Sequence, residues 1–143
     1  MKIRILLFTW IFLCFSPLAT ASIPMEKRDA CLTKMLSKNN FDSLPGYPDP
    51  LIVKKLESTF KASLNNFIES NNNGATKELF LKLLGKEISR FDRDPLDTED
   101  AEGVADNFER IMDCVNLESS GGILNNWMYG EWLGEKVEAL KNN

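Results

Sequence analysis

Two cysteines, Cys31 and Cys114, follow the apolar start of the chain, and their side chains are the most reactive ones in it. The sequence contains no histidine. A cysteine nucleophile needs a neighbouring base, most often imidazole, and tetrahedral zinc sites combine three or four cysteine and histidine ligands. Two cysteines without histidine cannot build either site in its usual form. In an oxidising compartment we therefore expect a disulfide between Cys31 and Cys114, which would stabilise the fold by roughly 4 kcal/mol.

The beginning of the chain predicts export. Two basic residues precede an apolar run at 5–15, and the small residues at 19–21 form a pattern that signal peptidase cleaves. The run is short for a membrane span, although an uncleaved anchor is the alternative. Cleavage would remove the third cysteine, Cys14. We expect a signal peptide over 1–21, a single domain over 22–143, a periplasmic location and no membrane association after cleavage.

Acidic residues dominate the remaining chemistry. Without the signal peptide, 15 basic and 21 acidic residues give a net charge of −6, which argues against a nucleic-acid partner. The stretch 92–118 holds ten acids and two arginines. Asp92, Asp94 and Asp97 do not have the spacing of a calcium loop, and no pair of carboxylates stands out as a glycosidase pair. The stretch is either a solvated helix face or an acidic surface that docks a basic partner.

Three aromatic residues near the end of the chain pose a similar choice. Trp127 and Trp132 lie five residues apart, so with Tyr129 they cannot all share one narrow stripe of a helix. Either the three rings cover the core of a small domain, or at least one is exposed and anchors a partner.

Hydrophobic periodicity predicts an all-α fold, a small bundle of about five helices. We expect helices over 25–38, 51–70, 76–91, 98–118 and 123–140. Asp49 and Pro50 are a good cap and first-turn residue for the second helix, and Asp97 or Thr98 can cap the fourth. No segment shows convincing strand alternation.

One set of short motifs resembles a known family. These motifs are Cys31 in RDACLTKML, Asp94-Pro95-Leu96, Glu102-Gly103, Phe108, Cys114, Leu117, Ser119 or Ser120, and Leu124. Together they resemble the periplasmic immunity proteins of type VI secretion amidase effectors. The sequence departs from that family after Cys114, where Glu118 and Ser119 replace an aromatic and a polar residue and Gly121-Gly122 is inserted.

The resemblance implies a helical bundle, often a homodimer, that binds a peptidoglycan amidase with a papain-like Cys-His site and blocks its cleft. It also implies the bridge between Cys31 and Cys114. We expect no catalytic residue, cofactor or metal ligand in this chain. There are three alternatives to amidase immunity. The protein could give immunity to a lipase or a lysozyme-like enzyme, it could be a structural envelope protein, or it could be an enzyme that uses carboxylates alone.

Charge and exposure, rather than the resemblance, select the residues expected to dock the partner. The acidic candidates and the aromatic anchors are Asp92, Asp94, Asp97, Glu99 and Asp100, with Trp127, Tyr129 and Trp132. A second candidate loop is the turn at 71–74.

Overall fold

The computed structural model describes residues 23–46 and 48–130, and α-helices form its regular structure throughout. The five helices in this part are α1 (Met25–Leu36), α2 (Pro50–Asn72), α3 (Lys77–Ile88), α4 (Thr98–Val115) and α5 (Ile123–Tyr129). The described residues contain no strand. The predicted all-α bundle is confirmed. None of these helices combines the length and apolarity needed to cross a bilayer.

Local sequence signals explain where three of the helices begin. The Asp49 carboxylate accepts a hydrogen bond from the Leu51 amide at 2.7 Å, and Pro50 occupies the first turn of α2. Asp97 caps α4 by accepting from the Asp100 amide at 2.8 Å. Thr76 does the same for α3. Each cap satisfies an amide that has no partner within its helix.

The first four helices end two or three residues from their predicted ends, at Leu36, Asn72, Ile88 and Val115, and the fifth ends at Tyr129 instead of 140. The third helix stops at Ile88 instead of 91, because a tight turn follows in which the Phe91 amide donates to the Ile88 carbonyl. The prediction of one continuous helix over 123–140 is wrong at Gly130, whose φ of 72° ends α5. The remainder of that predicted helix lies outside the described residues, as does the predicted signal peptide.

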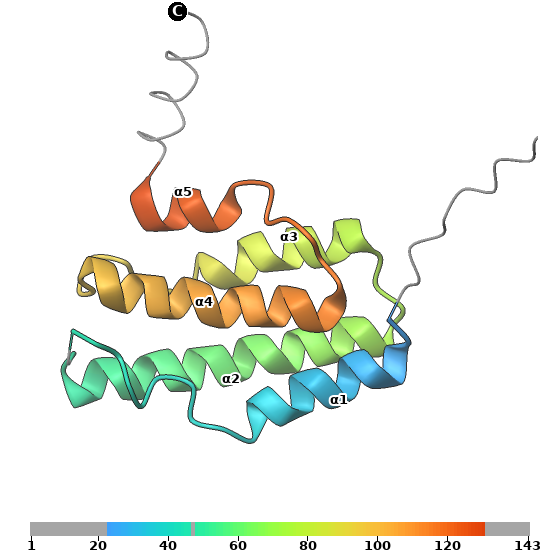
Figure 1. Cartoon of the computed structure of the whole chain (residues 1–143), viewed down its shortest axis with the longest axis horizontal. Helices are drawn as coiled ribbons and strands as arrows, with labels where there is room; N and C mark the ends of the chain where they lie inside the picture. Colours follow the sequence, from blue (N-terminus) through green and yellow to red (C-terminus); the bar gives the residue numbers. More distant parts are fainter. Residues whose placement is uncertain (1–22, 47, 131–143) are drawn as a thin grey trace, which may run out of the picture.

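The helices pack as a bundle around one phenylalanine-rich core. α1 lies against α2 and α4, while α5 packs across α3 and α4 (Figure 1). Four buried rings meet edge to face in a chain: Phe41 with Phe60 at 5.4 Å, Phe60 with Phe108 at 5.6 Å, and Phe108 with Phe91 at 5.2 Å. Because Phe41 and Phe91 come from the loops that follow α1 and α3, the core also holds these loops in place.

The predicted disulfide is confirmed. Cys31 of α1 and Cys114 of α4 are bonded, with their Cα atoms 5.5 Å apart. Cys31 is exposed, whereas Cys114 is only 4% exposed and belongs to the core. The bridge therefore fastens the outer face of α1 to the most buried helix of the bundle.

Candidate functional site

The segments that carry the predicted docking residues meet at one end of the bundle. At this end α2 and α4 begin, α3 and α5 finish, and the loops at 37–49 and 89–97 lie between them (Figure 1). We call this region the loop end. The turn at 71–74, the second candidate, lies at the opposite end of the bundle. Its first residue, Asn71, is buried and donates to the Met25 carbonyl at 3.1 Å, so this residue serves the packing of α1 on α2.

The end of α5 holds the loop between α3 and α4. The Trp127 indole donates to the Phe91 carbonyl at 2.9 Å, and Arg93 Nε donates to the Met128 carbonyl at 3.3 Å. The Arg93 guanidinium also donates to the Leu96 carbonyl within the loop. These bonds connect both sides of the loop to fixed backbone, so its exposed side chains stand on an ordered frame.

Four of the five predicted acidic residues are exposed at the loop end: Asp92, Asp94, Asp97 and Glu99. Asp97 is also the cap of α4, and Asp92 accepts a hydrogen bond from the Asp94 amide at 3.2 Å. Both carboxylates therefore have defined positions while their outer faces meet solvent. The structure brings these four predicted residues together.

Asp100 has a different role. It is 2% exposed, and its carboxylate accepts a hydrogen bond from the Gly46 amide at 2.9 Å. A Cβ atom on Gly46 would lie 2.3 Å from an Asp97 oxygen and 2.5 Å from an Asp100 oxygen, so glycine allows the loop to approach this closely. Nearby, a Cβ on Gly103 would lie 2.6 Å from the Leu44 side chain. Asp100 fastens the loop at 37–49 to α4, and we remove it from the set of partner contacts.

The aromatic residues divide in the same way. Trp127 is half-buried against the core and uses its indole N–H within the fold, so it is first a structural residue. Tyr129 is 43% exposed and is available at the loop end. Trp132 lies outside the described residues.

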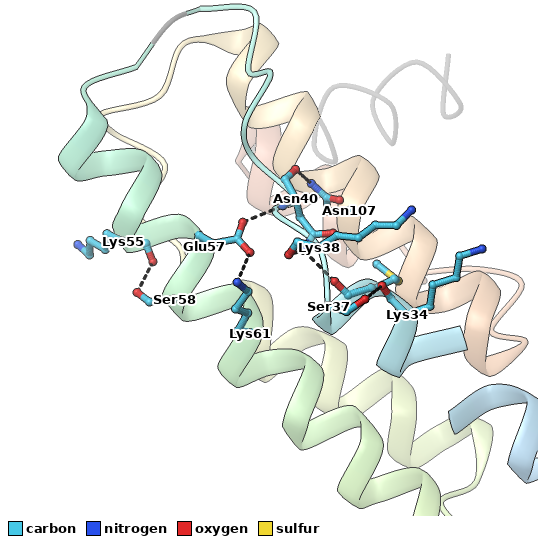
Figure 2. A network of polar contacts seen from close by, with 10 residues as sticks. Lys34, Ser37, Lys38, Asn40, Lys55, Glu57, Ser58, Lys61 and Asn107 are labelled. Carbon is cyan, nitrogen blue, oxygen red and sulfur yellow. Dashed lines mark hydrogen bonds and ion pairs between the residues drawn. The ribbon is translucent and has the colours of Figure 1, made fainter. Parts of the chain in front are cut away.

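A polar network fixes the beginning of the loop at 37–49 (Figure 2). The Asn40 amide donates to Glu57 of α2 at 2.8 Å, and Asn107 of α4 donates to the Asn40 carbonyl at 3.0 Å. The Asn40 side chain donates to the Met35 carbonyl in the last turn of α1 at 3.2 Å. Lys61 pairs with the other oxygen of Glu57 at 3.2 Å. Asn40 thus connects three helices to the loop, a role that no local sequence pattern indicates.

A small pocket of about 60 Å³ opens at the loop end between α2 and the loop at 89–97. Apolar side chains from both segments form most of its wall, and polar side chains complete it: Ile52, Leu56, Phe91 and Pro95, with Lys55, Thr59, Arg90 and Asp92. The sequence did not predict this pocket, because the rest of α2 and the whole of α3 lie between its two sides in the chain. The two sides meet only in the folded protein.

The outer face of α4 carries a continuous acidic stripe that extends away from the loop end. Its five members are all exposed and recur at intervals of three and four residues: Glu99, Glu102, Asp106, Glu109 and Asp113. The three ion pairs formed within the described part of the chain are Lys61–Glu57, Lys77–Glu118 and Arg90–Glu87, and none involves this stripe. The spacing was visible in the sequence and would have extended the predicted acidic surface.

One further carboxylate is buried in the last turn of α3, beneath the surface of the loop end. Glu87 of α3 is fully buried and accepts hydrogen bonds from Ser63 at 2.8 Å, Asn66 at 2.9 Å and Arg90. Burial alone would raise the pKa of Glu87, but the hydrogen bonds from Arg90, Ser63 and Asn66 and the charge of Arg90 together lower it. Glu87 therefore links α2 to α3 as a carboxylate.

Within residues 23–46 and 48–130, no three acidic or cysteine side chains are grouped so as to hold a metal ion.

The family model of DUF4844, a domain of unknown function, matches residues 23–132. The chain belongs to the DUF4844 family. The matched range of this DUF4844 chain includes both cysteines and the whole loop end. The chain is also similar to the crystal structure of a DUF3571 family protein from Acinetobacter baumannii AYE, with 33% sequence identity and a TM-score of 0.68. That match covers 79% of this chain and 97% of the other. No curated protein matches the chain.

Proposed function

We propose that this DUF4844 protein is a periplasmic immunity protein that binds and inhibits an envelope-targeting enzyme, and that the enzyme is a peptidoglycan amidase effector. The observation that carries the proposal is the loop end, where Asp92, Asp94, Asp97 and Glu99 are exposed around ordered loops. The amidase class rests on the motif resemblance of the sequence. In this proposal the protein inhibits by covering the enzyme's cleft and performs no catalysis of its own.

The disulfide supports a location outside the cytoplasm. Bridges of this kind form and persist in oxidising compartments, and Cys31 is exposed to any reductant that the solvent contains. Together with the predicted signal peptide, the bridge favours the periplasm, which is where an enzyme that cuts peptidoglycan would act.

The charge distribution supports a basic protein partner. The four exposed acids of the loop end continue into the acidic stripe of α4, and none of these carboxylates forms an ion pair within the described part of the chain. An unneutralised acidic surface attracts a basic one over distances of about a Debye length, which raises the association rate. Rapid capture suits an inhibitor, because each free enzyme molecule continues to damage the cell wall.

The ordering of the loops supports tight binding. Gly46 is held by Asp100, Asn40 by Glu57, and Phe91 by Trp127. Loops that are ordered before the partner arrives lose less conformational entropy on binding than mobile loops do. The loop end therefore has the properties of a surface prepared for one partner: exposed charge, exposed apolar groups and a fixed backbone.

A peptidoglycan-hydrolysis assay tests the proposal. Any amidase found to be encoded next to this gene is titrated with the oxidised protein, and we expect inhibition that is complete at one protein per enzyme. An amidase that is neither bound nor inhibited would remove the amidase assignment. The same titration against lipases and lysozyme-like enzymes encoded nearby would then test the other envelope toxins.

A matched pair of variants tests the docking surface. The triple variant Asp92→Asn, Asp94→Asn and Asp97→Asn retains side-chain oxygens for the turn and the cap. The control triple variant Glu26→Gln, Glu69→Gln and Glu78→Gln makes the same change in charge with exposed residues at the opposite end. We expect the first triple variant to slow association by about tenfold at low salt and far less at high salt, and the control to have a small effect. Equal effects of the two variants would contradict docking at the loop end.

A further inference from the structure

The apolar pocket at the loop end indicates how the partner is held. We infer that one aliphatic side chain, projecting from a basic surface of the partner protein, anchors in the pocket between α2 and the loop at 89–97. This inference rests on the proposed function and adds to it the residue class on the partner that determines specificity.

The pocket is preformed. Ile52 and Leu56 lie one helical turn apart on α2, and Phe91 and Pro95 form the facing wall. Phe91 is 4% exposed, its ring packs against the core, and its carbonyl accepts the indole hydrogen bond from α5. The walls therefore belong to the fixed frame of the bundle, and an incoming side chain enters without first reordering them.

The size of the pocket selects the occupant. A closed cavity of about 150 Å³ holds a benzene ring, so a pocket of about 60 Å³ encloses a smaller group. It suits the branched end of a valine, leucine or isoleucine. Leu51, the residue before Ile52 on the first turn of α2, is 76% exposed and adds a further apolar side chain at this end. An apolar centre of this kind, surrounded by polar groups, has the anatomy of a protein interface.

The charges around the pocket select the partner's surface. Asp92 lines the pocket, and Asp94 is exposed beside Pro95. Neither forms an ion pair within the described part of the chain. Arg90 also lines the pocket, but its guanidinium is bound to the buried Glu87. Lys55 stands on the α2 side, so we expect the partner's basic groups to lie over the loop at 89–97.

Filling the pocket tests the inference. Thr59 lies half-buried in its wall, and Thr59→Met would place a flexible apolar chain in the space that the partner needs. Ser58→Met is the matched control, because Ser58 is exposed on the same turn and is absent from this pocket. Calorimetric titration with the enzyme that the wild-type protein inhibits should show affinity lowered at least tenfold by Thr59→Met and little changed by Ser58→Met. If wild type and both variants bind equally, or if both variants are weakened equally, the anchor is refuted while the proposed function stands.

A second measurement needs no partner enzyme. Xenon enters small apolar cavities, so xenon under pressure should shift the NMR signals of Ile52, Leu56 and Phe91 in the wild-type protein and not in Thr59→Met. Absence of these shifts in the wild type would overturn the inference. Self-association that Thr59→Met abolishes would assign the pocket to a second copy of the chain and would also overturn it. Failure of the wild type to bind any envelope enzyme is a separate result, which refutes the proposed function itself.

Discussion

Removing the bridge between α1 and α4 should cost a substantial part of the stability of this protein. The disulfide joins positions separated by 83 residues, and the chain-entropy model assigns a loop of this length about 4 kcal/mol. A domain of this size is stable by about 5–15 kcal/mol in total. We therefore expect Cys31→Ser to lower the melting temperature by about 15 °C. Leu32 and Met35 keep α1 packed in the core, so the variant should remain folded at room temperature.

Replacing Cys31 and replacing Cys114 by serine should lower the stability by different amounts. Because Cys31 is exposed, a serine hydroxyl there remains in water and only the bridge is lost. Cys114 is 4% exposed, so Cys114→Ser also buries a hydroxyl among apolar groups, at a further cost of about 1–3 kcal/mol. The order of stability should be oxidised wild type, then Cys31→Ser, then Cys114→Ser.

Urea denaturation followed by circular dichroism measures these differences, using protein that begins at Ser22. The reduced wild-type protein should unfold at the same urea concentration as the Cys31→Ser variant. Thiol titration of the denatured oxidised protein should find no free thiol. If the free energies of unfolding of the reduced and oxidised wild-type proteins differ by less than about 1 kcal/mol, the bridge does not stabilise the fold by closing the long loop, and the reasoning fails. Two free thiols in the oxidised protein would also refute it.

Two further predictions concern the polar contacts that hold the fold. Gly46→Ala should destabilise the protein by about 1–3 kcal/mol, because the new methyl group collides with the Asp97 and Asp100 carboxylates and displaces the buried Asp100 oxygen from its amide donor. Gly85→Ala is the control: its Cβ meets nothing closer than 3.7 Å, so it should raise stability by up to about 1 kcal/mol, and a loss there would contradict the packing around α3. Glu87→Gln should lower stability by about 1–3 kcal/mol at neutral pH, because it removes the charged partner of Arg90. Since the pKa of Glu87 is lowered in the fold, its contribution is present above the ordinary glutamate pKa of about 4.3 and is lost as pH falls through the folded value. Urea titrations from pH 7 to pH 3 should therefore show the gap between wild type and variant narrowing, and a constant gap would refute the charged network.

Much of the fold could be predicted because its signals are local. Asp49 and Asp97 cap helices through amides two and three residues further along, and apolar spacing alone indicates the buried face of each helix. The end of α5 shows the limit of such signals. The apolar pattern continues through Gly130, but the backbone at this glycine leaves the helix at a positive φ, which a pattern of side chains does not register.

The candidate site could be predicted only in part. Asp97 and Asp100 have the same chemistry and lie three residues apart, and charge reasoning treats them alike. In the fold, the loop at 37–49 covers Asp100 and leaves Asp97 at the surface. The apolar pocket was invisible for a related reason, since Ile52 and Phe91 are brought together by the packing of α2 against the loop after α3.

The sequence by itself determined the helices, the pairing of Cys31 with Cys114 and the excess of acid, because composition and short-range spacing decide all three. Only the tertiary structure decided which acids remain exposed, that they gather at the loop end, and that a pocket opens beside them. The physical reason is that burial depends on which surfaces meet. Two segments far apart in the chain come into contact only when the whole core packs, and that contact separates an exposed residue, which is accessible to a partner, from one that holds the fold.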